Sequence, residues 1–142
     1  MAEHYRRYRE ELQEQQERLR HKARQLAHTI ANVLNDASQW HFNAEPLLEN
    51  YPEIEALYLI DTCAKQVGPT LMRAPARTFY EPSSEGCDHS LKEYYIGARH
   101  ALDGCHLTRR YLSLASGNLC HTYTSPISLN GQFYLLCIDL IQ

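Results

Sequence analysis

The chain has 142 residues, of which 44% are hydrophobic and 22% are charged, and its formal net charge is −3. This length suits one hydrophobic core and is short for two, and the apolar content excludes an intrinsically disordered chain. The slightly acidic balance excludes the basic surface that binding to nucleic acid requires. No run of about 18 apolar residues occurs, and the charged N-terminus lacks the apolar core of a signal peptide. We therefore expect a cytoplasmic protein without a membrane span, unless the sequence is part of a membrane receptor.

The five cysteines and eight histidines are widely separated along the chain. No CxxC, HxxxH or HExxH spacing is present, so we expect no metal site. The thiols are interpreted as reduced groups that pack like small apolar side chains, at Cys63, Cys87, Cys105, Cys120 and Cys137. The sequence also lacks GxSxG and P-loop motifs. We accordingly expect neither an enzyme nor a bound cofactor.

Residues 3–36 contain no glycine or proline and are rich in arginine, glutamate, glutamine, leucine and alanine. These residues favour a helix, so we predict one long helix within a first unit, residues 1–40. Apolar side chains recur every seven residues, at Tyr5, Leu12, Leu19, Leu26 and Val33. The seam positions between them are polar in the first half, which is typical of a weak coiled coil. Two interpretations stay open: a solvated helix docked at one end, or a dimerisation and signalling helix in which Leu19, Leu26 and Ile30 support a homodimer.

Residues 41–142 form the second predicted unit. It begins with a short helical turn around residues 47–48 and a buried strand at 56–60. A turn, a second strand near 69–73 and a loop rich in proline and serine then lead to residue 89. Ser90 is expected to cap a helix that runs to residue 101, with Glu93 completing a capping box.

Three further strands are expected, at residues 106–113, 119–127 and 132–141. Asn130 and Gly131 predict a tight hairpin between the last two strands. This order of elements predicts an α+β fold with five antiparallel strands.

The last predicted strand is apolar on both faces, so we expect it to lie in the centre of the sheet. Asp139 interrupts this apolar run. A buried carboxylate needs either a partner or a wet cavity, because burying it alone costs several kcal/mol. The alternatives to a cavity are an ion pair with Arg109 or Arg110, or a frayed strand end.

Lys92, Tyr94 and Tyr95 gather at the start of the later predicted helix. A cation near a helix N-terminus, with its N–H groups and dipole, is favourable for a small carboxylate. The alternative is a solvated lysine with tyrosines in the core.

Residues 51–140 resemble the Cache sensor domains of bacterial receptors (the PDC type), which are relatives of PAS domains. The stretches that carry the resemblance are residues 52–61 with 66–67, 90–95, Tyr111, 116–117, 125–127 and 138–139. The resemblance implies a single Cache domain, in which a long N-terminal helix packs on a PAS-like five-stranded antiparallel sheet.

Cache domains that bind amino acids hold the carboxylate with an arginine and aromatic residues, and the amine with a tyrosine and an aspartate. The resemblance places Lys92 at the arginine, Tyr94 and Tyr95 at the aromatic residues, Tyr111 at the tyrosine and Asp139 at the aspartate. This chain departs from the family at Lys92, because a lysine cannot form the two parallel hydrogen bonds that an arginine forms with a carboxylate. The implied ligand is therefore an organic acid, an amino acid or an amine.

The leading hypothesis is a small-molecule sensor that passes its state through the N-terminal helix to a downstream effector. A ligand-free dimerisation or interaction module is the second hypothesis, and a redox or metal sensor based on cysteine and histidine is the third.

Overall fold

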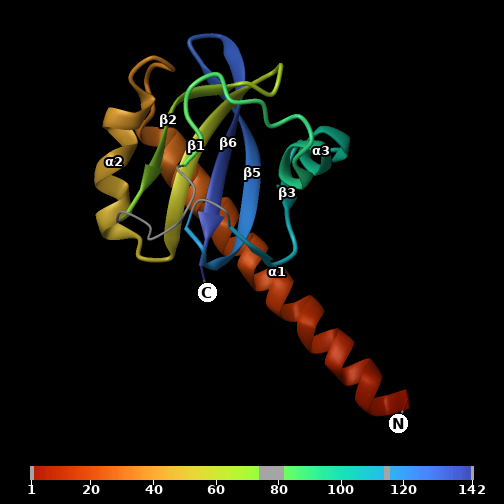
Figure 1. Ribbon diagram of the computed structural model, residues 1–142. Coiled ribbons are helices and arrows are strands. Elements are labelled where there is room, and N and C mark those ends of the chain that lie inside the picture. The colour runs from red at the N-terminus through yellow and green to blue at the C-terminus, as the bar shows by residue number, and fades with distance from the viewer. Residues whose placement is uncertain (1, 74–81, 114–115, 142) are drawn as a thin grey trace.

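The computed structural model describes residues 2–73, 82–113 and 116–141. Its helices are α1 (Ala2–Val33), α2 (Trp40–Asn50) and α3 (Glu93–His100). Its strands are β1 (Ile54–Asp61), β2 (Gln66–Met72), β3 (His106–Leu107), β4 (Tyr111–Leu112), β5 (Leu119–Leu129) and β6 (Gln132–Leu140). The α+β prediction is confirmed (Figure 1). The first half of the predicted proline-rich loop, residues 74–81, lies outside the described residues.

One antiparallel sheet contains all the strands, in the order β2-β1-β6-β5-β3, with β4 also paired to β5. Strand β6 lies between β1 and β5, as its two apolar faces predicted. The predicted hairpin is present, and Asn130 and Gly131 both have positive φ angles.

Among the described residues the sheet has six strands, one more than expected, and the difference lies at residues 106–113. Two short strands, β3 and β4, replace the single expected strand. At Thr108 the backbone N–H still donates to the Thr122 carbonyl at 3.0 Å, but the Thr122 N–H donates to the Thr108 side-chain oxygen at 2.9 Å and not to its carbonyl. Regular pairing with β5 resumes at Tyr111.

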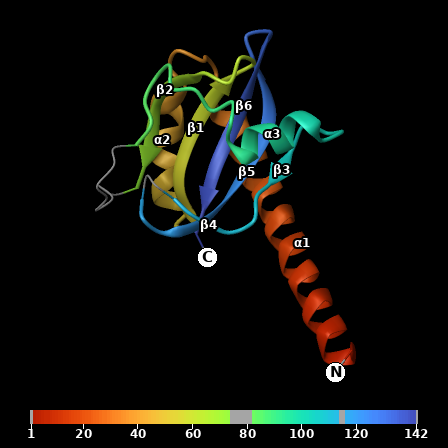
Figure 2. The same ribbon diagram turned by 45° about the vertical axis from the view of Figure 1, so that its right-hand side comes forward.

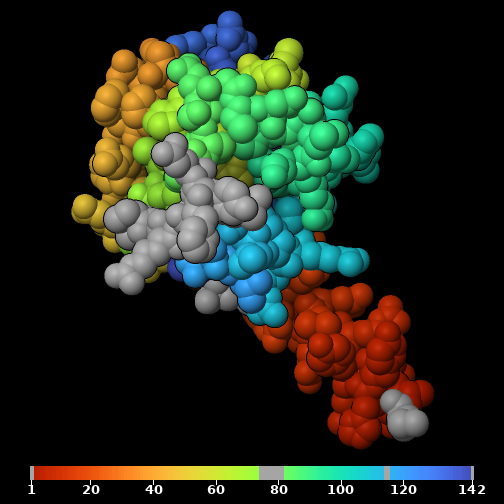
Figure 3. Space-filling view, in the orientation of Figure 1, coloured from red at the N-terminus to blue at the C-terminus, as the bar shows by residue number. Residues whose placement is uncertain are grey.

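Helix α1 docks on the sheet only with its C-terminal half. Ala23, Leu26, Ala27 and Ile30 are buried, whereas the helix up to Arg18 is exposed and extends away from the sheet (Figures 1 and 2). The space-filling view in Figure 3 shows this projecting half in red. None of the described helices is long and apolar enough to cross a membrane.

The homodimer stays a prediction, but of Leu19, Leu26 and Ile30 the last two are buried in the chain's own core and Leu19 packs against it. The side chains of Leu26 and Ile30 are 4% and 0% exposed. A seven-residue apolar repeat does not distinguish a partner helix from the chain's own sheet. The apolar side chains that remain exposed on α1 are Tyr5, Tyr8, Leu12 and, at its C-terminus, Val33.

Helix α2 is longer than the predicted turn at residues 47–48. Trp40, Ala44 and Leu48 recur every four residues and are buried, which stabilises the helix although it contains Pro46. The Trp40 indole N–H donates to the Val67 carbonyl at 2.7 Å. Gly68 lies so close that a Cβ atom there would be 2.8 Å from the indole nitrogen. This contact holds α2 against β2.

Helix α3 begins at Glu93, so the prediction that Ser90 caps it was wrong. Lys92 occupies the N-cap position, and no side-chain hydrogen bond caps the helix. Glu93 instead lies 3.5 Å from the His106 ring nitrogen. Gly97 packs directly on the His106 ring and leaves no room for a Cβ atom. These contacts fix α3 on β3.

The two faces of the sheet have different roles. Leu57, Leu59, Leu136 and Ile138 pack in the large core with α1 and α2. The opposite face packs against α3 in a smaller cluster, with members Tyr58, Ile60, Ala64, Tyr94, Tyr95 and Cys137.

Candidate functional site

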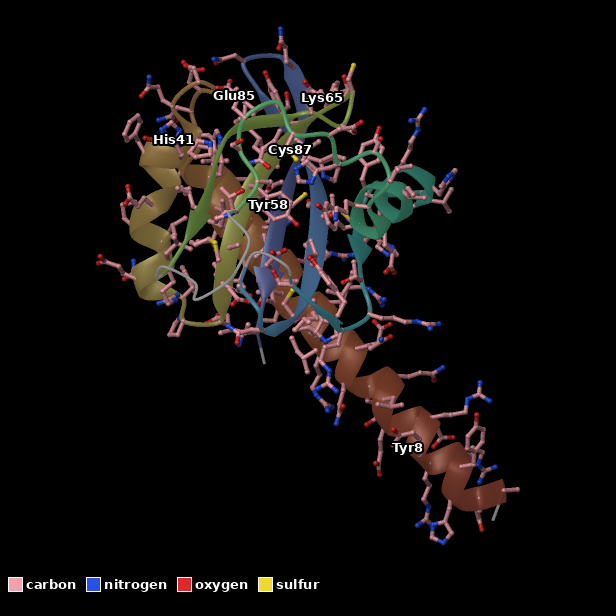
Figure 4. All side chains as sticks on the ribbon, viewed as in Figure 1. Tyr8, His41, Tyr58, Lys65, Glu85 and Cys87 are labelled. Atoms are coloured by element: carbon pink, nitrogen blue, oxygen red, sulfur yellow. The ribbon has the colours of Figure 1, made fainter. Side chains whose placement is uncertain are left out.

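A cavity of about 620 Å³ lies on the face of the sheet opposite α1. Its lining comes from β1, β2, β4, β6, the start of α3 and the segments beside them: Tyr58, Thr70, Ser83, Cys87, His89, Lys92, Glu93, Tyr94, Thr108, Tyr111, Leu112, Ser113 and Asp139. Figure 4 labels two of these residues, Tyr58 on β1 and Cys87 on the segment that crosses above it. This volume is in the range of small-molecule sites in proteins.

The cavity lining includes four of the five site residues predicted from the sequence. Lys92, Tyr94, Tyr111 and Asp139 all line it. Tyr95 does not, although it is buried beside the cavity in the cluster under α3. Its hydroxyl lies 3.4 Å from the Arg99 guanidinium, on the same helix.

Asp139 is buried on the central strand and is held by two hydroxyl groups. Tyr58 and Thr122 donate to its Oδ1 atom at 3.0 and 2.7 Å. Within the described part of the chain, its Oδ2 atom has no hydrogen-bond partner, and Asp139 lines the cavity. Burial raises the pKa of Asp139 to about 6, although both hydroxyl groups act in the opposite direction. The side chain therefore offers one unpaired oxygen to the cavity.

The predicted alternative of an ion pair with arginine was wrong. Arg109 and Arg110 are exposed, and no salt bridge among the described residues includes Asp139. The frayed strand end is also wrong, because Asp139 pairs with Thr122 on β5 and with Ala56 on β1.

Tyr111 is joined to Asp139 through Thr122. Its hydroxyl lies 2.5 Å from the Thr122 hydroxyl oxygen. Because the Thr122 proton is donated to Asp139, Tyr111 must be the donor to Thr122. Burial raises the pKa of both Tyr58 and Tyr111, so these phenols keep their protons at neutral pH.

A second network holds the wall of the cavity on the β2 side. His89 is buried, and its ring nitrogens contact the Gln66 amide oxygen and the Tyr94 hydroxyl. The same amide oxygen accepts a 2.7 Å hydrogen bond from the Ser83 hydroxyl. Burial, and then the charge of Lys92, lowers the pKa of His89.

Among the described residues that line the cavity, Lys92 supplies a positive charge. It is exposed at the entrance of α3, and no salt bridge connects it to a carboxylate among the described residues. The described residues contain no group of three or more histidine, cysteine or acidic side chains that could hold a metal ion.

Sequence reasoning missed Tyr58, Thr122, Gln66 and His89. The signal for Tyr58 was weak: a hydroxyl-bearing residue within an otherwise apolar buried strand needs a partner for its polar atom. The other three residues give no local signal, because their roles depend on contacts between distant segments.

Comparison with solved structures supports a sensor-domain fold. The sensory domain of the Campylobacter jejuni chemoreceptor Tlp3, solved with isoleucine bound, has a TM-score of 0.63 and 19% identity over 91% of this chain and 53% of that one. The YkuI protein of Bacillus subtilis, which has an EAL domain and was solved with c-di-GMP and calcium, has a TM-score of 0.60 and 21% identity over 81% of this chain and 30% of that one. At these identities the similarity establishes the fold: a long helix packed on an antiparallel sheet, as in the sensory domains of chemoreceptors.

Sequence comparison gives one partial match among curated proteins. The citrate (Re)-synthase of Syntrophus aciditrophicus is 31% identical over 81 residues, which are 57% of this chain and 13% of that protein. The chain thus spans a small part of this relative and about half of the chemoreceptor domain. No family model matches the sequence.

Proposed function

We propose that this chain is a sensor module of the Cache type, which binds a small amino-acid-like ligand in the cavity between the sheet and α3. The observation that carries the proposal is Asp139, a buried carboxylate with one oxygen unpaired at the cavity. The unpaired Oδ2 atom is not among the fully buried polar atoms without a partner in the described residues, so a ligand in the cavity can reach it. An ammonium group of a ligand would supply the missing donor and a compensating charge.

The hydroxyl groups beside Asp139 strengthen the case for an ammonium group. Tyr58 and Tyr111 both donate their protons within the protein, so each has only lone pairs left for a ligand. With Asp139 Oδ2, this end of the cavity presents acceptors. A ligand therefore has to bring donors.

Lys92 supports a carboxylate at the other end of the ligand. Its ammonium group is free of acidic partners among the described residues, and it lies at the N-terminus of α3, where the helix dipole favours negative charge. Structures of the Tlp3 sensory domain hold isoleucine and L-valine, ligands with both groups. We propose a ligand of the same class, with an amino and a carboxylate group, for this chain, because Asp139 and Lys92 both line its cavity.

We also propose that the chain is a binding module and not an enzyme, because the similar chemoreceptor structures are sensory domains. We further propose that residues 1–40 transmit the state of the sensor unit, residues 41–142. The exposed half of α1 would then support a homodimer through Tyr5, Tyr8 and Leu12, and connect it to an effector.

Thermal unfolding with candidate ligands tests the proposal. Valine should raise the melting temperature of the full chain, because a ligand that binds only the native state stabilises it. Asp139→Asn and Lys92→Ala should each reduce the shift. If amino acids, amines and organic acids all leave the melting temperature unchanged at millimolar concentration, the sensor assignment is wrong.

A further inference from the structure

We propose that Gln66 and His89 are positioning residues that fix the direction of the Tyr94 hydroxyl, so that Tyr94 presents only lone pairs to the cavity. The inference rests on the proposed function for its ligand, and it deepens that function. Whether Tyr94 donates or accepts hydrogen bonds in the cavity then depends on which ring nitrogen of His89 carries the proton.

The first step is the orientation of the Gln66 side-chain amide. Its nitrogen faces two backbone carbonyl oxygens, at Gly68 (3.2 Å) and Ser83 (3.1 Å), and the Thr70 hydroxyl at 3.0 Å. A flipped amide would direct its oxygen at both carbonyl oxygens, which is repulsive. The amide oxygen of Gln66 must therefore face His89.

The second step is the tautomer of His89. The Gln66 oxygen is an acceptor and lies 2.9 Å from His89 Nε2, so Nε2 carries the proton. In a neutral imidazole the other nitrogen, Nδ1, is then an acceptor. Tyr94 is consequently the donor in its contact with Nδ1.

The third step is the charge of His89, since an imidazolium would reverse this contact. The ring stacks on Tyr58 of β1 and contacts Tyr94 of α3, both of which are neutral phenols. Nearby charges are Lys92, which opposes protonation, and Asp88, which favours it and itself pairs with Lys65 at 3.5 Å. Burial and Lys92 together lower the pKa of His89, which keeps the ring neutral.

The consequence is that, among the described lining residues, three tyrosine oxygens act as acceptors at the cavity. Tyr58 and Tyr111 donate toward Asp139, and Tyr94 donates to His89. Together with Asp139, these oxygens suit a ligand group rich in N–H donors, such as a primary ammonium. The Tyr94 hydroxyl would oppose a carboxylate, which has acceptors only.

The first arm of the test needs no ligand. Nitrogen chemical shifts of the His89 imidazole, measured by NMR at about pH 7.5, should show a protonated Nε2 and an unprotonated Nδ1 in the full chain. Gln66→Glu places a carboxylate next to Nε2–H and should raise the pKa of His89. A wild-type His89 that is charged at that pH, or protonated on Nδ1, overturns the inference, and this holds even if the Gln66 variant fails to fold.

The second arm measures ligand preference with valine, isobutylamine, which lacks its carboxylate, and isovalerate, which lacks its amino group. If His89 becomes protonated in Gln66→Glu, its Nδ1–H donates to the Tyr94 oxygen. The Tyr94 O–H can then turn and donate into the cavity. The preference for isobutylamine over isovalerate should then fall by about tenfold. In a Tyr94→Phe background the same Gln66 change should have no such effect, because there is no hydroxyl to turn.

The two arms separate failure of the inference from failure of the proposed function. If none of the three compounds binds the wild type, the proposed function fails, while the NMR spectra still decide the positioning of Tyr94. If they bind and the preference changes equally with and without the Tyr94 hydroxyl, Gln66 and His89 are structural only.

Discussion

Thr122 on β5 donates a 2.7 Å hydrogen bond to Asp139 on β6, and the two residues face each other directly in the strand register. The bond is therefore part of the sheet itself and exists without a ligand. It holds the carboxylate so that the second oxygen is left for the cavity. The pH dependence of the protein should reflect this arrangement.

The stability of the chain should decrease as the pH rises through about 6. The ordinary pKa of Asp139 is 3.8 and burial raises it to about 6, so the folded state binds this proton more tightly than the unfolded state. The stabilisation is complete below the unfolded pKa and is lost as the pH rises through the folded one. Asp139→Asn keeps an acceptor for Tyr58 and Thr122 without the charge. At pH about 8 it should be more stable than the wild type, by up to about 3 kcal/mol.

Urea denaturation of both proteins at acidic and alkaline pH measures this difference. Glu49→Gln, a change at an exposed carboxylate, is the control and should alter neither the stability nor its pH dependence. An Asp139→Asn protein that is less stable than the wild type at alkaline pH would contradict the account of a desolvated carboxylate.

Binding of an amine-bearing ligand should weaken below about pH 6, because protonated Asp139 cannot pair with an ammonium group. Near that pH, binding should also release a proton, since the ligand charge lowers the pKa of Asp139. Calorimetric titration of valine in two buffers with different ionisation enthalpies measures the released protons. Equal heats in the two buffers near pH 6 would show that the ligand does not contact Asp139.

Lys92→Ala should weaken valine binding by about tenfold, whereas Lys92→Arg should retain it. Isobutylamine, without a carboxylate, should not show this tenfold loss in Lys92→Ala. Arg99→Ala removes a charge from the other end of the same helix, outside the cavity lining, and serves as the matched control. If valine binding to Lys92→Ala is unchanged, Lys92 is a solvated charge.

The ligand state should reach α1 through Arg24 more than through Lys22. Both side chains form salt bridges of 3.7 Å, Arg24 with the exposed Asp103 and Lys22 with the half-buried Glu53. Asp103 follows α3, whose first residues line the cavity, while Glu53 precedes β1. Hydrogen exchange in α1 should respond to valine in Lys22→Ala and should lose this response in Arg24→Ala. Both variants should stay folded, because ion pairs at the surface contribute little to stability. Equal responses in the two variants would exclude this route.

The exposed half of α1 should carry the homodimer contact. Deleting residues 1–16, or Leu12→Asp, should weaken the dimer and leave the sheet folded, because these residues do not contribute to the core. Leu26→Asp should instead unfold the chain, since Leu26 is buried. Sedimentation and circular dichroism distinguish the two outcomes. A wild-type chain that is monomeric at tens of micromolar concentration would contradict the dimer.

Local patterns predicted much of the fold. The long helix, the central position of β6 and the hairpin at Asn130 each follow from composition or periodicity within one segment. The start of α3 was misplaced because Glu93 contacts His106 on β3 instead of completing a capping box. That contact lies outside any local window.

The candidate site could be predicted only in part, for the same reason. Asp139 was recognisable as a charge in an apolar strand. Its partner Tyr58 is 81 residues away along the chain, and Gln66 and His89 are 23 residues apart. Hydrogen bonds across such separations depend on the register of the whole sheet, which the sequence of one strand does not determine.

The contact between Trp40 and β2 can be followed by the intrinsic fluorescence of the protein. Trp40 is the sole tryptophan, and its fully buried indole donates a hydrogen bond to Val67, next to Gln66 at the cavity wall. Indole emission depends on the polarity and hydrogen bonding around the ring. Fluorescence of the unlabelled chain can thus follow the attachment of α2 to this wall in real time, with no second tryptophan to obscure the signal.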